Sequence, residues 1–212
     1  MKKLFLSLFI VASLCFNLRA DEGMWIPMLL QNNEQDMQEM GMNITAEDIY
    51  SINHSSMKDA VVLFDGGCTG EIVSNQGLLL TNHHCGFDWI QYHSTVEHDY
   101  LTHGFWAMSK EEELPCPGIS AVMLKSMEDV TDRVLEGVTK ETSNDERAEI
   151  VTENIKKIKE EAEANSDYQV VIKSFYHGNK YYMIYNEVFK DVRMVGAPPS
   201  NIGKFGGDTD NW

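Results

Sequence analysis

Short apolar and β-branched runs, separated by polar turn residues, mark the middle of the chain. Residues 61–64, 68–74 and 78–82 are runs of this kind, and the sequences DGG and NQG lie between them. Short runs bounded by Gly, Asn and Asp are typical of strands joined by tight turns. The pattern therefore predicts strands connected by hairpin turns in this part of the chain.

The apolar period changes to that of a helix over residues 143–165. Ser143 and Glu146 have the spacing of a capping box, in which each side chain bonds the backbone N–H of the other residue. Apolar residues at helical spacing then share one face: Val151, Ile155, Ile158 and Ala162. Glu and Lys cover the opposite face, so we expect an amphipathic surface helix.

The other segments complete a mainly β pattern. Residues 24–58 carry apolar residues at mixed spacing, which favours helical or irregular structure with a helix start at 45–48. A strand is expected at 120–124, and residues 168–196 favour two or three strands around a turn at 177–179. The sequence thus predicts a mainly β fold with flanking helices and shows no internal repeat.

The first twenty residues have the pattern of a secretory signal. Lys2 and Lys3 precede an apolar run over residues 4–16 that is too short to span a bilayer, and Ala20 offers a small residue for cleavage. No later stretch approaches ~18 consecutive apolar residues. We therefore expect an export signal at 1–20 and no membrane span, with the protein in the periplasm or at the cell surface.

A large excess of acidic residues limits the choice of partner. The chain has 33 Asp and Glu against 17 Lys and Arg, and its formal charge is −16. Loss of Lys2, Lys3 and Arg19 with the signal would take this charge to −19. Because nucleic acids bind basic surfaces, no nucleic-acid partner is expected.

Three cysteines remain after the signal: Cys68, Cys85 and Cys116. Exported proteins commonly form disulfides, so an odd count leaves one thiol free or its partner missing. The Gly- and Pro-rich stretch at 197–212 also ends on Trp212 with nothing to cover that side chain. Both features predict that the chain is part of a larger protein.

The sequence LLLTNHHCGF carries the candidate chemistry, because it places two histidines and a cysteine directly after an apolar run. On extended backbone the neighbours His83 and His84 would point in different directions, which does not suit a zinc site. The five-residue recurrence of His93, His98 and His103 fits neither a helix face nor a strand face. A metal site is therefore the less favoured interpretation.

Cys85 could act as a nucleophile or form a disulfide. A nucleophilic thiolate needs a partly exposed, electropositive setting, whereas an exported thiol is more often bridged. Cys68 is the candidate partner, at the far end of the predicted hairpin. A bridge across this loop adds roughly 3 kcal/mol of stability and would hold the residue before Cys85, which is His84.

The stretch CTGEIVSNQGLLLTNHHC resembles the chymotrypsin-like serine peptidases, in which a disulfide-bonded cysteine directly follows the general-base histidine at the end of a barrel strand. A base that takes a proton from a serine hydroxyl and returns it to the leaving amine has to be held firmly. The resemblance implies that His84 is this base. His83 would be a structural neighbour whose ring points elsewhere.

Further segments narrow the resemblance to the bacterial dipeptidyl-peptidase 7 and 11 family of exported serine exopeptidases: GGCTGEIVSNQGLLLTNHHCGFDWIQYHS, EHDYLTHGFWA, EEELPCPG and GAPPSNIGKFGGDTDNW. This family implies a chymotrypsin-like double β-barrel with a helical cap domain, which removes dipeptides from free peptide N-termini. Of its His, Asp and Ser triad only the histidine is matched, at His84. The family's Asp and Ser would follow Trp212, and nothing marks Asp88 or Asp99 as substitutes. Residues 21–212 would thus be the N-terminal part of the catalytic domain, inactive alone.

The last two residues match a pair that in this family binds the free α-amino group of the substrate. Asn211 would accept hydrogen bonds from the ammonium group, and the indole face of Trp212 would attract its charge. The alternative is that Asn211 caps a turn and Trp212 belongs to the core. The expected partners are peptides with free N-termini, with no cofactor or metal, and a homodimer is expected for the full-length form. Two other functions remain open: a non-catalytic module that binds peptide N-termini, and an enzyme with Cys85 as nucleophile.

Overall fold

The computed structural model describes residues 25–203, and the predicted signal and the Asn211–Trp212 pair lie outside this range. The chain divides into two compact units, at residues 1–46 and 47–212. The described part of the first unit is helical, as expected, with η1 (Pro27–Asn32) followed by α2 (Glu34–Glu39). Pro27 opens η1, where its fixed φ suits a helix start. The Glu34 carboxylate accepts a hydrogen bond from the Ala46 amide at 3.0 Å.

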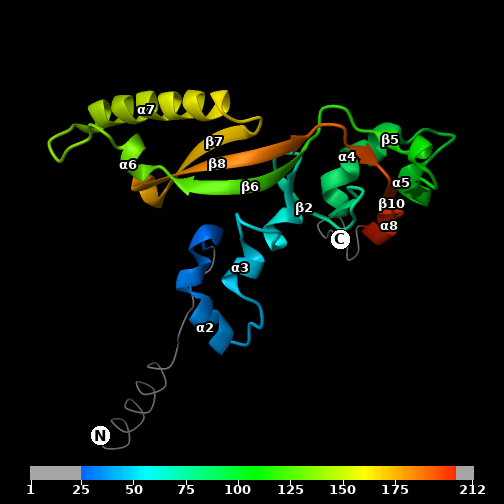
Figure 1. Ribbon diagram of the computed structural model, residues 1–212. Helices are drawn as coiled ribbons and strands as arrows, with labels where there is room; N and C mark the ends of the chain where they lie inside the picture. Colours follow the sequence, from blue (N-terminus) through cyan, green and yellow to red (C-terminus); the bar gives the residue numbers. More distant parts are fainter. Residues whose placement is uncertain (1–24, 204–212) are drawn as a thin grey trace, which may run out of the picture. The chain divides into compact units, whose positions relative to one another are not determined.

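An antiparallel six-stranded sheet dominates the second unit (Figure 1). Its strands, in sheet order, are β3 (Leu79–Thr81), β2 (Cys68–Ile72), β1 (Val61–Phe64), β6 (Ala121–Asp129), β8 (Lys180–Phe189) and β7 (Gln169–Phe175). The sheet is open among the described residues, with β3 and β7 at its edges. The expected β-rich fold with flanking helices is confirmed, and the strands predicted at 61–82 all form.

The other elements are helices and two short strand pairs. The helical ones are α3 (Ala46–Ile49), η2 (Met57–Asp59), α4 (His83–His93), α5 (Tyr100–His103), η3 (Lys110–Glu112), α6 (Thr131–Val134), α7 (Asn144–Ala164), η4 (Tyr176–Gly178) and α8 (Ser200–Gly203). Two short antiparallel pairs join β4 (Phe105–Trp106) to β10 (Gly196–Ala197) and β5 (Leu114–Pro115) to β9 (Arg193–Met194). Within the described range no helix is both long and apolar enough to cross a membrane.

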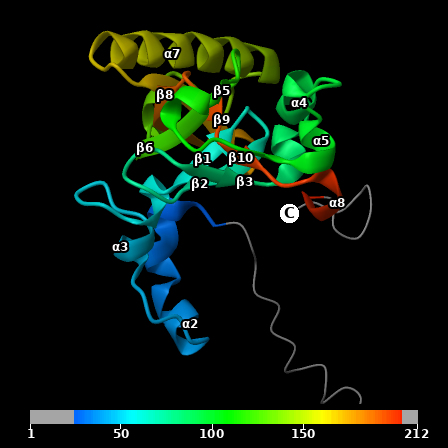
Figure 2. The ribbon, with the colours of Figure 1, turned by 90° about the vertical axis from the view of Figure 1, so that its right-hand side faces the viewer.

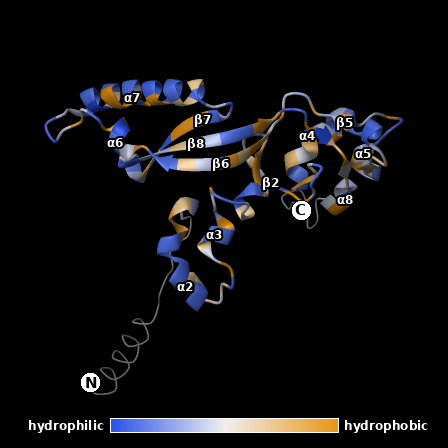
Figure 3. Cartoon of the chain, in the orientation of Figure 1, coloured by the Kyte–Doolittle hydropathy of each residue, from blue (hydrophilic) through white to orange (hydrophobic). Residues whose placement is uncertain are grey.

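The predicted helix α7 packs against the sheet at β7 and against α6. Its capping box is present, with the Ser143 amide donating to Glu146 at 3.0 Å and the Glu146 amide donating to Ser143 at 3.3 Å. The ribbon of α7 is mostly hydrophilic and is interrupted by hydrophobic positions (Figure 3). The apolar face of α7 meets a core of buried side chains: Val130, Val134, Ile158, Ala162, Val170, Tyr181 and Met183.

A second core lies at the other end of the sheet, beside α4. Its buried members are Phe64, Cys116 and Ile119, and the half-buried residues packed on them are Cys68, Leu79, Cys85, Trp89, Val192 and Met194. In this region α4, α5 and α8 lie side by side (Figure 2). Both cysteines of the predicted bridge therefore contribute to the core that supports α4.

The strand expected at 120–124 is longer than the sequence indicated. β6 continues to Asp129, with a register shift between Leu124 and Ser126. The second half of β6 is rich in polar residues, so the pattern of apolar residues did not predict it. The ten-residue β8 supplies its hydrogen-bond partners, and a 3.3 Å ion pair between Lys125 and Glu187 crosses the two strands.

The α7 core gives a direct test of this packing. Ile158→Ala removes a side chain that is 5 % exposed, so we expect the free energy of unfolding to fall by about 2–5 kcal/mol in chemical denaturation. Ile52→Ala is the matched control, because Ile52 is 64 % exposed and its loss should change stability by less than about 0.5 kcal/mol. Equal effects of the two substitutions would contradict the described packing of α7.

Candidate active site

The β2–β3 hairpin brings Cys68 close to the start of α4. Gly70 pairs with Thr81 and Ile72 pairs with Leu79, so the chain returns antiparallel to β2 before α4 begins. At the turn the Ser74 hydroxyl accepts hydrogen bonds from the backbone amides of Gln76 and Leu78, at 3.2 and 3.0 Å. The hairpin expected from the sequence is therefore the element that positions the site.

The two histidines lie in the first turn of α4, so the expectation of extended backbone for them was wrong. Asn82 is still extended, at φ −70° and ψ 147°, and its carbonyl accepts the first helical hydrogen bond from the Cys85 amide at 3.0 Å. The segment is rich in His and aromatic residues and contains Gly86, so helix propensity did not reveal it. Packing of Trp89 and Ile90 and the link through Cys85 stabilise the helix instead.

The predicted disulfide between Cys68 and Cys85 is present in the structure, with a Cα–Cα distance of 6.1 Å. It joins the first residue of β2 to the first turn of α4 across 17 residues of sequence. Because both cysteines also pack on the Phe64 core, the bridge is anchored in the interior on one side. The first turn of α4 is consequently fixed to the sheet by a covalent link.

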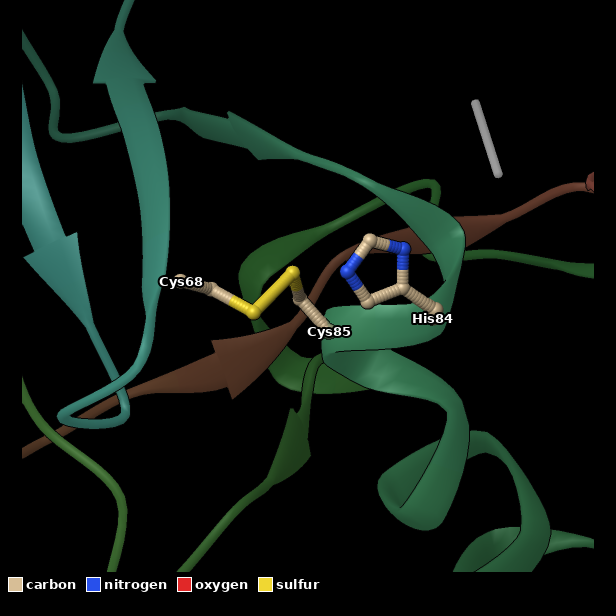
Figure 4. Close-up of side chains that lie close together, drawn as sticks. All are labelled: Cys68, His84 and Cys85. Atoms are coloured by element: carbon tan, nitrogen blue, oxygen red, sulfur yellow. A yellow bond between two sulfur atoms is a disulfide. The ribbon is translucent and has the colours of Figure 1, made fainter. Parts of the chain in front are cut away.

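His84 is exposed beside this bridge (Figure 4). One of its ring nitrogens and the sulfurs of Cys68 and Cys85 all lie within 4.8 Å of one another. The imidazole is therefore accessible to a substrate or a second side chain, while its backbone is held by the neighbouring Cys85. This combination of access and fixed position suits a proton-transfer residue.

His83 lies on a different face of the helix, because successive helical residues are about 100° apart. Its side chain is only 5 % exposed, and its ring lies 5.8 Å from that of Phe87, centroid to centroid. Gly203 of α8 also packs against this ring. His83 thus belongs to the packing beneath the site and His84 to its surface.

The cluster of Cys68, His84 and Cys85 has ligand types that bind metals, but its chemistry does not fit a metal site while the bridge is intact. Cysteine coordinates metals as a thiolate, and both sulfurs here are bonded to each other. Two of the other histidines, His93 and His98, have separate contacts. His93 Nε2 lies 3.0 Å from the Pro115 carbonyl oxygen, and His98 stacks on Tyr100 at 6.0 Å between ring centroids.

Neither Cys85 nor Cys116 is an activated nucleophile. Cys85 is bridged and has no thiolate to attack with. Cys116 is the free cysteine of the described range, and its side chain is buried, with Sγ 3.5 Å from the Leu114 carbonyl oxygen. Burial raises the pKa of the Cys116 thiol, although a hydrogen bond with the Met194 backbone partly opposes this, so the unreactive thiol form is favoured.

The two aspartates that follow the histidine have other surroundings. Asp99 is the N-cap of α5 and accepts a hydrogen bond from the Thr102 amide at 3.0 Å. Hydrogen bonds with Thr102 lower the pKa of the Asp99 carboxyl. Asp88 is exposed on α4. Among the described residues, no hydrogen bond joins either carboxylate to His84, so neither acts as its orienting partner there.

A Ser, His and Glu group that the sequence analysis did not single out lies near residue 50. The Ser51 hydroxyl donates to Glu47 at 2.6 Å and lies 3.3 Å from His54 Nδ1. However, Ser51 is 1 % exposed, and its hydroxyl oxygen accepts hydrogen bonds from the backbone amides of Asn53 and His54. These contacts stabilise a turn, and the burial of the hydroxyl prevents attack on a substrate.

Comparison with known proteins gives a consistent result. The family model described as Peptidase S46 matches residues 20–212. The chain is 53 % identical over 212 residues to the Asp/Glu-specific dipeptidyl-peptidase of Flavobacterium psychrophilum, covering 99 % of this chain and 29 % of that protein. It is 50 % identical over 203 residues to dipeptidyl-peptidase 7 of Phocaeicola vulgatus, covering 92 % of this chain and 28 % of that protein.

Solved structures agree with the sequence comparisons. The crystal structure of Porphyromonas endodontalis DPP11 in complex with the dipeptide Arg-Glu matches with a TM-score of 0.75 and 48 % identity, over 91 % of this chain and 29 % of that chain. The same protein in complex with substrate also matches with a TM-score of 0.75, at 49 % identity. The chain spans less than a third of the length of the relatives it matches.

Thiol labelling tests the bridge that fixes α4. Under denaturing conditions without reductant, we expect iodoacetamide to modify Cys116 and to leave Cys68 and Cys85 unmodified, because disulfide sulfurs do not react. After reduction all three should be modified, as measured by peptide mass spectrometry. Label on Cys85 before reduction would contradict the bridge and reopen a nucleophilic role for that residue.

Proposed function

Since this chain belongs to the peptidase S46 family, we propose that it supplies the general base of a serine-type dipeptidyl peptidase, and that this base is His84. The proposed enzyme releases dipeptides from the free N-terminus of peptides. The observation that carries the proposal is the exposed His84 imidazole on a helical turn fixed by the Cys68–Cys85 disulfide.

Hydrolysis by a serine hydroxyl requires an accessible imidazole that is held in position. A neutral imidazole takes the proton of a serine hydroxyl as that oxygen attacks the peptide carbonyl, and it then returns the proton to the leaving amine. Both transfers need the ring to stay within hydrogen-bonding reach of the reacting atoms. An exposed ring on a fixed turn meets this requirement, whereas the buried His83 does not.

The remaining members of the triad come from elsewhere in the proposed enzyme. We propose that its aspartate and serine follow Trp212, as the family resemblance implies. In support, the chain covers 29 % of the Flavobacterium psychrophilum relative, to which it is 53 % identical. Removal of a single triad residue already costs several orders of magnitude in rate. The 212-residue chain on its own is therefore proposed to be inactive, and residues 21–212 to be the N-terminal part of the catalytic domain.

The substrates are proposed to be peptides with a free α-amino group. The relatives are named for dipeptide release, and one solved relative holds the dipeptide Arg-Glu. Asn211 and Trp212, which lie outside the described residues, match the family pair that binds the ammonium group. An amide oxygen accepts hydrogen bonds from that group, and an indole face attracts its charge.

The protein is further proposed to be exported and to act outside the cytoplasm, where the Cys68–Cys85 bridge is stable. Residues 1–20 are the proposed signal. The formal charge of −16 argues against nucleic acid as a partner, and a homodimer is proposed for the full-length form.

Replacement of the proposed base is the decisive test. In the full-length protein, His84→Ala should lower kcat for dipeptide release on the order of 10³-fold or more, because the serine hydroxyl loses its proton acceptor. His98→Ala is the matched control and should leave kcat within about twofold, since the His98 side chain is exposed and its ring stacks on Tyr100. Undiminished hydrolysis by His84→Ala would refute the proposed role. Peptide binding with no hydrolysis by the unmodified protein would favour a non-catalytic module that binds N-termini.

Substitution at Trp212 tests the proposed amine site. Trp212→Ala should raise KM for dipeptide release roughly 3- to 30-fold, because a cation–π contact contributes about 0.5–2 kcal/mol. Trp212→Phe keeps an aromatic face and should raise KM less. The measurement is steady-state kinetics on a peptide with a free N-terminus. Equal effects of the two substitutions on KM would contradict a contact between the aromatic face at position 212 and the ammonium group.

A further inference from the structure

Helix α8 packs onto the first turn of α4 through a glycine. Gly203 is buried, and a Cβ atom at this position would overlap His83 Cδ2 and lie 2.5 Å from Cγ and 2.8 Å from Nε2. Real Cβ atoms essentially never come so close to another heavy atom. The Gly203 backbone therefore rests directly on the His83 imidazole, and any side chain at 203 would have to displace that ring.

The segment that ends at Gly203 has little freedom to move away from His83. Helix α8 packs on both α5 and α4, and Ala197, shortly before α8, pairs with Phe105 in the β10–β4 ladder. Gly104, at φ +76°, allows a second close approach, because a Cβ there would lie 2.8 Å from the Ala197 carbonyl oxygen. A clash at position 203 would thus be relieved mainly by movement of His83 and its helical turn.

A movement of His83 would change the position of His84. It is buried and contacts Phe87 one turn further along α4, and it is joined by a peptide bond to the exposed His84. Cys85 is held from the opposite side by its disulfide. The backbone that carries the His84 side chain is therefore held between two contacts, the bridge at Cys85 and the α8 backbone at His83.

We propose that Gly203 is a positioning residue for the general base: by seating α8 on the His83 ring, it fixes the first turn of α4 and so the orientation of His84. This inference rests on the proposed function of His84. Gly203 contacts no reacting atom in this role and acts only through His83.

The role predicts a particular kinetic signature. A misplaced base affects only the transition state, so kcat and kcat/KM should fall together while KM stays nearly constant. Displacement of the segment after Gly203, which carries the proposed amine site at Asn211 and Trp212, would instead raise KM. The two effects can therefore be separated by steady-state kinetics.

The test is a double-mutant cycle in the full-length protein. Gly203→Ala should lower kcat roughly 10- to 100-fold with KM within about twofold, since a displacement of about 1 Å at a catalytic group can cost on the order of 100-fold. In the His83→Ala background the same change should alter kcat less than about twofold, because the ring that clashes is gone. Gly67→Ala is the matched control with unchanged kcat, as an added Cβ there meets nothing within 4 Å.

The outcomes separate this inference from the proposed function. Unchanged kcat in Gly203→Ala, a rise in KM alone, or equal losses in the two backgrounds would each overturn the positioning role. If Gly203→Ala alone fails to fold, the comparison of His83→Ala with His83→Ala/Gly203→Ala still decides, and a further large loss of kcat there would refute the ring contact. Loss of activity in His84→Ala together with any of these results would leave the function intact and remove only the role of Gly203.

Discussion

The disulfide between Cys68 and Cys85 is the constraint on which the candidate site depends. It joins a strand of the main sheet to a helix whose own sequence, rich in histidine and aromatic residues, has little intrinsic tendency to begin where it does. Helices of this length gain most of their stability from tertiary contacts. The bridge supplies such a contact in the first turn of α4.

Two adjacent histidines take different roles because a helix, and not a strand, carries them. A rotation of about 100° per residue places His83 in the interior and His84 at the surface. On a strand the two side chains would instead point to opposite faces of the sheet. The contact of the buried His83 with Gly203 links the first turn of α4 to the segment formed by β10 and α8.

The sequence correctly predicted the elements that are marked by residues close together in the chain. The capping box and apolar stripe of α7 and the hairpin turns between β1, β2 and β3 were all readable from neighbouring residues. The pairing of Cys68 with Cys85 followed from the hairpin, and His84 from a family resemblance. The start of α4 and the second half of β6 were missed, because tertiary packing and the partner strand β8 stabilise them. The packing contact between Gly203 and His83 joins residues 120 positions apart, and no pattern in the sequence marks it.

The two cores of the second unit explain why a covalent link is placed at the site. The core beneath α7 has seven buried members and a long helix to cover it, so apolar burial can define its geometry. Among residues 25–203 the core beside α4 has three, and it supports short helices and two-residue strands. A small core fixes its surroundings weakly, and proteins commonly supplement such cores with disulfides. The bridge therefore gives the small core the rigidity that burial alone would not provide, at the place where the position of one imidazole matters most.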